Sequence, residues 1–374
     1  MLAALLPGRR IDLAGLAERD LSPFGGHRVE ALAALARQGP AHLIHVGGEL
    51  LSCTAYQAAV MLLEPAGAAA AIAHYDSDPQ AAAAWAAQQL GTARTMPYIA
   101  GRDAMVSPGR LIFNAVGGVE WASLTASQRG EALAALKSAD WLSVRDHLTR
   151  TALRADGVGA SLCPDPAVMV AECFADRIDQ HRQRGEPAES KQLYPQGYLA
   201  CQFSGEFADE VTLTELARAL GNICAESGLG LVLFRAGTAP WHDSLDAYER
   251  LRAMLPPGRA RVFRSLHLWD ICALIAGSQG FCGSSLHGRI VALAYGLPRV
   301  SLIAPQQGER PSKTVAFAET WEPEDLPGGV VAAALEPALR RVLGLPANAL
   351  RQTAAGLCDL YRASQAQWSA MLED

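Results

Sequence analysis

The chain has 374 residues, half of them apolar and 19% charged, a composition typical of a soluble globular protein with room for two domains. Its formal net charge of −6 argues against nucleic acid or an anionic membrane as the main partner. Eight scattered cysteines without a C-x-x-C pair predict reduced thiols rather than a disulfide or zinc framework. The apolar start, Met1–Pro7, is too short to span a bilayer, so no transmembrane segment is predicted.

The first half of the chain alternates between short apolar runs and helical patterns, which is typical of βα units around a parallel sheet. The predicted strands are Arg10–Leu13, His42–Val46, Leu111–Val116, Trp141–Val144 and Ser161–Cys163. The predicted helices are Val29–Arg37, Ala55–Leu63, Pro79–Leu90, Ser127–Lys137 and His147–Arg154.

A polar, charged segment from Asp176 to Gln196 interrupts this alternation and is predicted to be a linker. Behind it, the predicted strands are Tyr198–Phe203, Leu229–Phe234, Ala260–Phe263, Gly280–Cys282 and Arg299–Ile303. The predicted helices begin at the capping box Thr212–Glu215 and continue with Tyr248–Leu255, His267–Ala276, 286–295, Val331–Leu343 and Ala347–Met371. The sequence therefore predicts an α/β fold of two Rossmann-like domains facing a cleft: residues 1–175, a linker at 176–196, residues 197–345, and a C-terminal helix at 346–374.

The segment Phe281–Gly288 (Phe-Cys-Gly-Ser-Ser-Leu-His-Gly) lies between an apolar and an amphipathic run, so it predicts a strand, a tight turn and a helix start. Ser284 or Ser285 is suited to cap that helix, which places His287 in its first turn. Free N–H groups and the positive end of the helix dipole favour an anion there. An imidazole beside an anion suits acid–base catalysis; the alternative is a capped helix that merely carries a polar histidine.

Other candidate residues follow predicted strands, where parallel α/β sheets bind ligands. Gly47 and Gly48 allow close approach to the backbone and Glu49 offers a carboxylate, although a simple strand-to-helix turn explains the same residues. Asn114 follows the next strand with the same ambiguity.

Charged residues follow four more of the predicted strands. Arg145 is suited to bind a phosphate or carboxylate with two hydrogen bonds, while Asp146 beside it is expected to cap the next helix. Asp165 is a candidate base or another helix cap. Arg235 and Lys313 are candidate anion contacts, with solvated surface residues as the alternative.

In their order and spacing, these motifs resemble the polysaccharide pyruvyl transferase family from Ala41 to about Phe317. The resemblance rests on Gly47-Gly48-Glu49-Leu50-Leu51, Ser143-Val144-Arg145-Asp146, Pro164-Asp165-Pro166, Ser284-Ser285-Leu286-His287-Gly288, Ala294-Tyr295-Gly296-Leu297-Pro298, and Lys313 followed by Phe317. It implies a two-domain fold like that of the GT-B glycosyltransferases. It also implies transfer of the pyruvyl group of phosphoenolpyruvate to two hydroxyls of a sugar, which forms a cyclic ketal and releases phosphate.

The resemblance further implies a bacterial enzyme, in the cytoplasm or peripheral to the inner membrane. Its acceptor would be a saccharide, lipid- or nucleotide-linked, in a cell-surface or exopolysaccharide precursor. The first domain would bind this acceptor and the second the donor. Two alternatives stay open: a nucleotide-sugar glycosyltransferase of GT-B architecture, and a catalytically silent binding protein in polysaccharide assembly.

By the same resemblance, Arg145 and His287 match positions at the donor site. His287 is then the first candidate for general acid or base, and Glu49 or Asp165 for the carboxylate that accepts a hydroxyl proton. Arg145, Arg235, Lys313 and the helix start at Ser285 are candidates for binding the anionic groups of phosphoenolpyruvate. The predicted set is completed by Ser284, Gly288, Gly47, Gly48 and Asn114, and the scheme requires no metal or cofactor.

One departure from the family concerns the start of the chain. Relatives open with a strand and an N-x-G-D loop before a helix, whereas here residues 1–6 resemble the end of that helix and Arg10–Leu13 the second strand. The N-terminal domain is therefore expected to lack its first strand, either because the start was assigned too late or because this half-domain is rebuilt.

Overall fold

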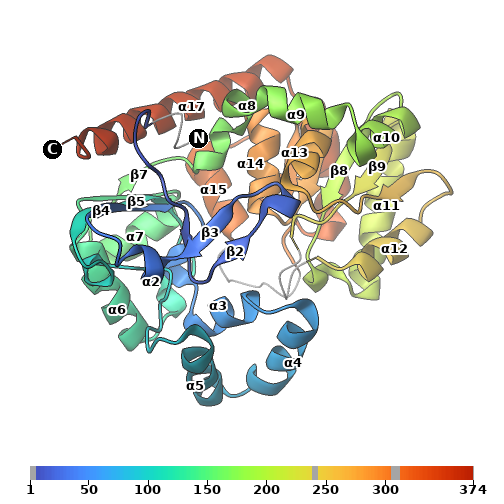
Figure 1. Cartoon of the computed structure of the whole chain (residues 1–374). Coiled ribbons are helices and arrows are strands. Elements are labelled where there is room, and N and C mark those ends of the chain that lie inside the picture. The colour runs from blue at the N-terminus through green and yellow to red at the C-terminus, as the bar shows by residue number, and fades with distance from the viewer. Residues whose placement is uncertain (1–5, 238–242, 305–311, 374) are drawn as a thin grey trace. The chain divides into compact units, whose positions relative to one another are not determined.

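A computed structural model of the chain describes residues 6–237, 243–304 and 312–373 (Figure 1). It divides into two compact units, the first comprising residues 1–166 and 360–374 and the second residues 167–359. Both units contain a parallel sheet with helices, so the predicted α/β class is confirmed. The C-terminal helix α17 (Ala347–Ala370) begins in the second unit and ends in the first, and is thus not a separate part.

The expected linker at 176–196 is helical and belongs to the second unit. It forms most of α9 (Ala175–Arg182) and all of α10 (Gly185–Leu193), with Ile178 fully buried. Its charged residues make tertiary contacts: Glu186 accepts hydrogen bonds from the backbone N–H groups of Arg264 and Ser265. The polar composition suggested a linker because the partners of these charged residues lie more than 70 residues away in the sequence, so the local sequence gives no sign of them.

The sheet of the first unit has four parallel strands in the order β4-β5-β6-β7. They are β4 (Ala41–Val46), β5 (Pro108–Val116), β6 (Trp141–Val144) and β7 (Ser161–Leu162), each at or close to a predicted strand. The apolar runs predict them well because β5 and the end of β6 are buried, with Leu111, Phe113 and Val116 in one core cluster.

The chain before β4 departs from its prediction. The expected strand Arg10–Leu13 is wrong, since these residues are irregular; the first strand described is β1 (Ala14–Gly15). The expected helix Val29–Arg37 begins instead as β3 (Arg28–Ala31), which lies between β1 and β2 (Arg19–Asp20), and only α2 (Leu32–Leu35) is helical. Residues 28–31 form a strand because their backbone groups bond to β1 and β2. Local sequence propensity could not predict this pairing. The expected helix end at residues 1–6 falls mostly outside the described residues.

The helices of the first unit have local signals that fix their ends. Thr54 and Thr125 form capping boxes with the glutamines three residues on, at the starts of α3 (Ala55–Met61) and α6 (Ala126–Lys137). The remaining helices are α4 (Pro65–Tyr75), α5 (Pro79–Leu90) and α7 (His147–Ala155). Because α7 starts directly behind β6, the residues between these two elements lie at the carboxyl end of the sheet.

The second unit has a five-stranded parallel sheet in the order β10-β9-β8-β11-β12. The strands are β8 (Tyr198–Gln202), β9 (Gly230–Leu233), β10 (Ala260–Val262), β11 (Gly280–Gly283) and β12 (Arg299–Ser301). The helices are α8 (Val170–Cys173), α9, α10, α11 (Glu210–Ser227), α12 (Leu245–Ala253), α13 (Leu268–Ala276), α14 (Leu286–Ala294), α15 (Lys313–Trp321) and α16 (Leu335–Leu343).

Both faces of this sheet are covered. Along β8, Leu199 and Cys201 join a core cluster with α11 and α16, whereas Tyr198 and Ala200 join a second cluster with α13. The chain runs from β8 outward to β10 and then crosses to β11, so the strand order reverses between β8 and β11. In open parallel sheets ligands bind at such a reversal, beyond the carboxyl ends of the strands.

Candidate functional site

In the first unit, the carboxyl ends of three strands bring together Glu49, Arg145 and Asp165. Glu49 follows β4, Arg145 follows β6, and Asp165 follows β7. The Arg145 guanidinium donates to Asp165 Oδ2 at 2.8 Å and to Glu49 Oε2 at 2.5 Å. Burial alone would lower the pKa of Arg145, but the two carboxylates outweigh it and raise that pKa.

This cluster carries one positive and two negative charges, so the charge of Arg145 is already matched within the protein. The predicted role of Arg145 as an anion contact stays a prediction, and its observed role is to hold two carboxylates in place. The side chain of Glu49 is 25% exposed, whereas those of Arg145 and Asp165 are each 3% exposed. Glu49 is therefore the carboxylate of this cluster that a substrate can reach.

Glycines make room for the cluster. Gly47 and Gly48 both have positive φ, at 57° and 76°, which favours glycine and turns the chain so that Glu49 faces Arg145. A Cβ at Gly117 would lie 2.5 Å from Glu49 Oε2 and 2.6 Å from Arg145 Nε. Gly117 follows Asn114 in a strand-end segment that the sequence leaves open between a ligand contact and a simple turn, and only glycine fits beside this ion pair. Glu49 also accepts a hydrogen bond from the Val119 N–H at 2.7 Å.

Two residues near the cluster have structural roles. Asp146 caps α7, because its Oδ1 accepts from the Thr149 N–H at 2.7 Å, as predicted. Asn114 is fully buried in β5, and its amide donates to the Tyr361 hydroxyl of α17 at 3.0 Å. This placement favours a packing role for Asn114 over the predicted substrate contact.

In the second unit, the segment 281–288 forms the predicted strand, turn and helix. β11 ends at Gly283, Ser285 caps α14 by accepting from the Gly288 N–H, and His287 lies exposed in the first turn. Ser284 accepts a hydrogen bond from the Ser204 N–H. Gly288 is buried: a Cβ there would lie 2.7 Å from the Phe281 ring, so this glycine serves the packing of α14 on β11. Because Arg145 and His287 belong to different units, their predicted meeting at one donor site stays a prediction.

Residues at the ends of β8 and β9 complete this site. Gln202, the last residue of β8, accepts from the Ser285 N–H at 2.8 Å and donates to Asp243 Oδ1 at 2.6 Å. Arg235 follows β9 and is partly buried; its Nε is enclosed without a hydrogen-bond partner among the described residues. Neither Gln202 nor Asp243 was singled out in the sequence. The one available signal was that Gln202 is a polar residue in an otherwise apolar predicted strand.

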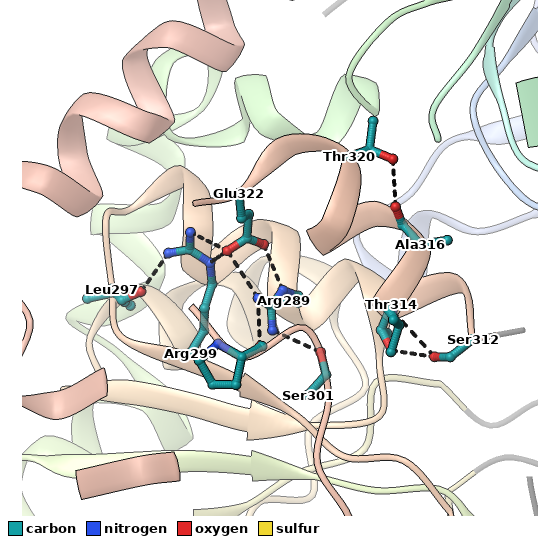
Figure 2. A network of polar contacts seen from close by, with 11 residues as sticks. Arg289, Leu297, Arg299, Ser301, Ser312, Thr314, Ala316, Thr320 and Glu322 are labelled. Atoms are coloured by element: carbon teal, nitrogen blue, oxygen red, sulfur yellow. Dashed lines mark hydrogen bonds and ion pairs between the residues drawn. The ribbon is translucent and has the colours of Figure 1, made fainter. Parts of the chain in front are cut away.

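Lys313 is the first residue of α15, and Ser312 caps this helix by accepting from the Val315 N–H. The end of α15 is anchored by a buried charge network, shown in Figure 2. Glu322 accepts hydrogen bonds from Arg289 Nε and Arg299 Nε, both at 2.7 Å, and all three side chains are fully buried. Arg289 lies in α14 two residues after His287, so the network links the helix of His287 to the helix of Lys313.

Among the described residues, His181, His267 and Asp270 are the one group of three whose potential metal-binding atoms lie within 4.8 Å of each other. His181 Nε2 lies 2.7 Å from Arg184 Nη2, and Nδ1 lies 2.5 Å from Asp270 Oδ1. An arginine can only donate, so Nε2 accepts and Nδ1 carries the proton toward Asp270. Both ring nitrogens are thus used in hydrogen bonds, which fits a structural histidine better than a metal ligand.

Comparison with known proteins gives one family. The family model of polysaccharide pyruvyl transferases matches residues 97–304, more than half of the chain. This range contains Arg145 and Asp165 of the first unit and the whole segment 281–288 of the second. A search of curated protein sequences gives no match. Within the described residues, no helix combines the length and apolar character needed to cross a membrane.

Solved structures that align with much of this chain have low sequence identity to it. UDP-N-acetylglucosamine 2-epimerase from Rickettsia bellii is 11% identical, with a TM-score of 0.49 over 88% of this chain and 95% of that one. The UDP-forming α,α-trehalose-phosphate synthase from Burkholderia vietnamiensis is 12% identical, with a TM-score of 0.47 over 93% and 85%. UDP-GlcNAc 2-epimerase from Neisseria meningitidis is 8% identical, with a TM-score of 0.45 over 89% and 100%.

Proposed function

The chain belongs to the polysaccharide pyruvyl transferase family, and we propose that it transfers the pyruvyl group of phosphoenolpyruvate to two hydroxyls of a sugar, forming a cyclic ketal and releasing phosphate. The acceptor in this proposal is a cell-surface or exopolysaccharide precursor, carried by a lipid or a nucleotide, and the reaction takes place at the cytoplasmic side of the inner membrane.

The observation that carries the proposal is the position of His287. This exposed imidazole lies in the first turn of α14, beside the point where the strand order of the second sheet reverses. A helix start attracts anions, and phosphoenolpyruvate carries both a phosphate and a carboxylate. Arg235, which follows β9 of the same sheet, offers a guanidinium whose Nε has no hydrogen-bond partner among the described residues. Lys313 at the start of α15 is the further cation proposed for the donor.

The reaction requires one protonation and two deprotonations. The proton given to the methylene carbon of phosphoenolpyruvate turns that carbon into a methyl group, and the first sugar hydroxyl bonds to the central carbon. The bond from that carbon to the phosphate oxygen then breaks, phosphate leaves with its electron pair, and the second hydroxyl bonds in its place. We assign the first proton to His287 as general acid, because an imidazole titrates near neutral pH.

The hydroxyl protons need a carboxylate, and Glu49 is our candidate. It is the exposed member of the Glu49–Arg145–Asp165 cluster, and Arg145 holds its Oε2 while the Val119 N–H holds its Oε1. Asp165 is buried against Arg145, which favours Glu49 over Asp165 for contact with a sugar. The surplus negative charge of the cluster suits hydroxyl donors and disfavours a second anion.

The test is donor binding followed by turnover, with the full chain. Phosphoenolpyruvate should raise the melting temperature, and at 100 times its Kd the expected stabilisation is about 2.7 kcal/mol. UDP-glucose should leave the melting temperature unchanged. Phosphate release is then measured from phosphoenolpyruvate with a panel of nucleotide-linked and lipid-linked saccharides.

His287→Gln should keep phosphoenolpyruvate binding within a few-fold and slow phosphate release by about 10²- to 10⁴-fold, the usual range for loss of a general acid. His74→Gln is the matched control, because His74 is exposed on α4 of the first unit. Full phosphate release by His287→Gln would refute the role of His287. A melting shift with UDP-glucose alone would favour the glycosyltransferase alternative, and no response to either donor would favour a silent binding protein.

A further inference from the structure

Asp243 is a partly buried carboxylate beside the His287 turn that has no part in the proposed reaction. It lies directly before Ser244, which caps α12. Its Oδ2 accepts from the Ala236 N–H at 2.6 Å, and its Oδ1 accepts from Gln202 Nε2 at 2.6 Å. Two short bonds to separate elements hold this carboxylate at the ends of β8 and β9.

Gln202 passes this contact on to α14. The Ser285 N–H can only donate, so the amide oxygen of Gln202 must face it, and the amide nitrogen must face Asp243. The orientation of the Gln202 amide is thereby fixed from both sides. Gln202 is 3% exposed, so water does not readily replace either partner.

The chain of contacts ends in the turn that carries His287. Ser285 is bound through its N–H by Gln202, and its hydroxyl oxygen accepts from the Gly288 N–H at 3.1 Å. These two bonds fix the residues on either side of His287 in the first turn of α14. We propose that Asp243 is a positioning residue of the His287 site, acting through Gln202 and Ser285 to hold the start of α14. As a positioning role for catalysis, this rests on the proposed function.

The surroundings of Asp243 make its charge sensitive to pH. Burial raises its pKa to about 6, against the opposing effect of the hydrogen bonds from Ala236, Gln202 and Gly237 and of the charge of Arg235. The other titratable group that faces it among the described residues is Tyr248 of α12, whose own pKa is raised by burial and by Asp243. As pH falls through about 6, Asp243 gains a proton and becomes a weaker acceptor for Gln202. Positioning of the turn should therefore weaken on the acid side.

The test exchanges the side-chain types at positions 243 and 202, which form the Asp243–Gln202 bridge to Ser285. In Asp243→Asn, the new amide faces two donors, the Ala236 N–H and the Gln202 amide nitrogen. In Gln202→Glu, the new carboxylate lies 2.6 Å from that of Asp243. Each single variant therefore breaks the bridge. In the double variant, the new amide at position 243 can accept from the Ala236 N–H and donate to the new carboxylate at position 202. That carboxylate can in turn accept from the Ser285 N–H, so every contact of the bridge is restored. Asp246→Asn is the control, because it removes an exposed charge three residues away in α12.

We expect kcat for phosphate release to fall about 10- to 100-fold in each single variant, as for misplacement of a catalytic group by about 1 Å. The double variant should recover to within about 3-fold of the parent chain, and Asp246→Asn should match the parent. A purely structural role of Asp243 would leave the pH dependence of kcat unchanged. In our proposal, the fall of kcat on the acid side, near pH 6, should shift in the double variant. Unchanged kcat in Asp243→Asn, or a double variant no better than the singles, would overturn the proposal.

A second readout does not depend on turnover. Hydrogen exchange of the Ser285 N–H, followed by NMR, should speed up at least 10-fold in the single variants and return to the parent rate in the double variant. If the parent chain itself releases no phosphate, the proposed function is refuted, but the exchange measurement still tests the bridge. Unchanged exchange in Asp243→Asn would refute the bridge whatever the reaction is.

Discussion

Replacing Glu322 with glutamine tests how the second unit holds its helices. Glu322 supplies the negative charge of the buried network in Figure 2, and it faces two guanidinium groups. Burial alone would raise the pKa of Glu322, but Arg289 and Arg299 outweigh it and lower that pKa. Glu322→Gln keeps the shape of the side chain and leaves two buried positive charges without this counter-charge.

The expected cost is about 3–5 kcal/mol, the usual penalty for removing one partner of a buried ion pair. For a unit of about 200 residues this corresponds to a melting temperature lower by about 6–20 °C. The measurement is urea and thermal unfolding followed by intrinsic tryptophan fluorescence, to which Trp269 and Trp321 of the second unit contribute. Glu319→Gln is the matched control, since Glu319 is exposed in α15, three residues before Glu322, and should change stability little.

A second comparison separates charge from packing. The triple variant Arg289→Met, Arg299→Leu and Glu322→Leu removes all three charges, and apolar replacement of a complete buried network is often neutral or stabilising. It should therefore be more stable than Glu322→Gln. If Glu322→Gln unfolds within about 1 kcal/mol of the parent chain, the buried network is not what holds α14 to α15, and the reasoning fails.

Two other perturbations address the charged groups of the two sites. Arg145→Met leaves Glu49 and Asp165 side by side without their shared counter-charge, so we expect a loss of about 3–5 kcal/mol in urea unfolding; a loss below about 1 kcal/mol would contradict the cluster. Asp243 has a folded pKa of about 6, above its ordinary value of 3.8, so the folded state binds its proton more tightly. The stability of the parent chain relative to Asp243→Asn should therefore fall, by up to about 3 kcal/mol, as pH rises from about 4 to 6, and a flat difference would contradict that pKa.

The sequence predicted elements that depend on local pattern. Buried strands such as β5 and β9 appear as apolar runs, and the turn at Gly283–Ser285 carries its own cap and glycine. The start of α11 shows the limit of this approach, because Thr212–Glu215 matched a capping box, yet the helix begins at Glu210 with Asp209 as its cap. Two neighbouring residues offered the same capping chemistry, and only the surrounding fold selects between them.

The sequence could not predict which charges would meet. Arg145 stood at a strand end and suggested an anion site, but its partners, Glu49 and Asp165, lie 96 and 20 residues away in the sequence. The same holds for Asp243: its partner Gln202 lies 41 residues away in the sequence, and Gln202 in turn binds Ser285, 83 residues further along the chain. An arginine that binds substrate and one that binds a protein carboxylate have the same local sequence signal, and only the partner distinguishes them.

The charges that meet favour different ligands for the two units. The first unit presents Glu49 from a cluster with one surplus negative charge, whereas the second presents His287 at a helix start, with Arg235 behind a neighbouring strand. Since the whole chain carries a net charge of −6, an anionic donor gains no attraction from the protein as a whole and must depend on such a local positive site. A sugar hydroxyl that must lose a proton needs a negative site instead, namely a fixed carboxylate that no bound anion occupies. The proposed reaction, which joins an anion to hydroxyls, would need these two kinds of site, and in our proposal the helix start of His287 with Arg235 serves the donor and Glu49 serves the hydroxyls.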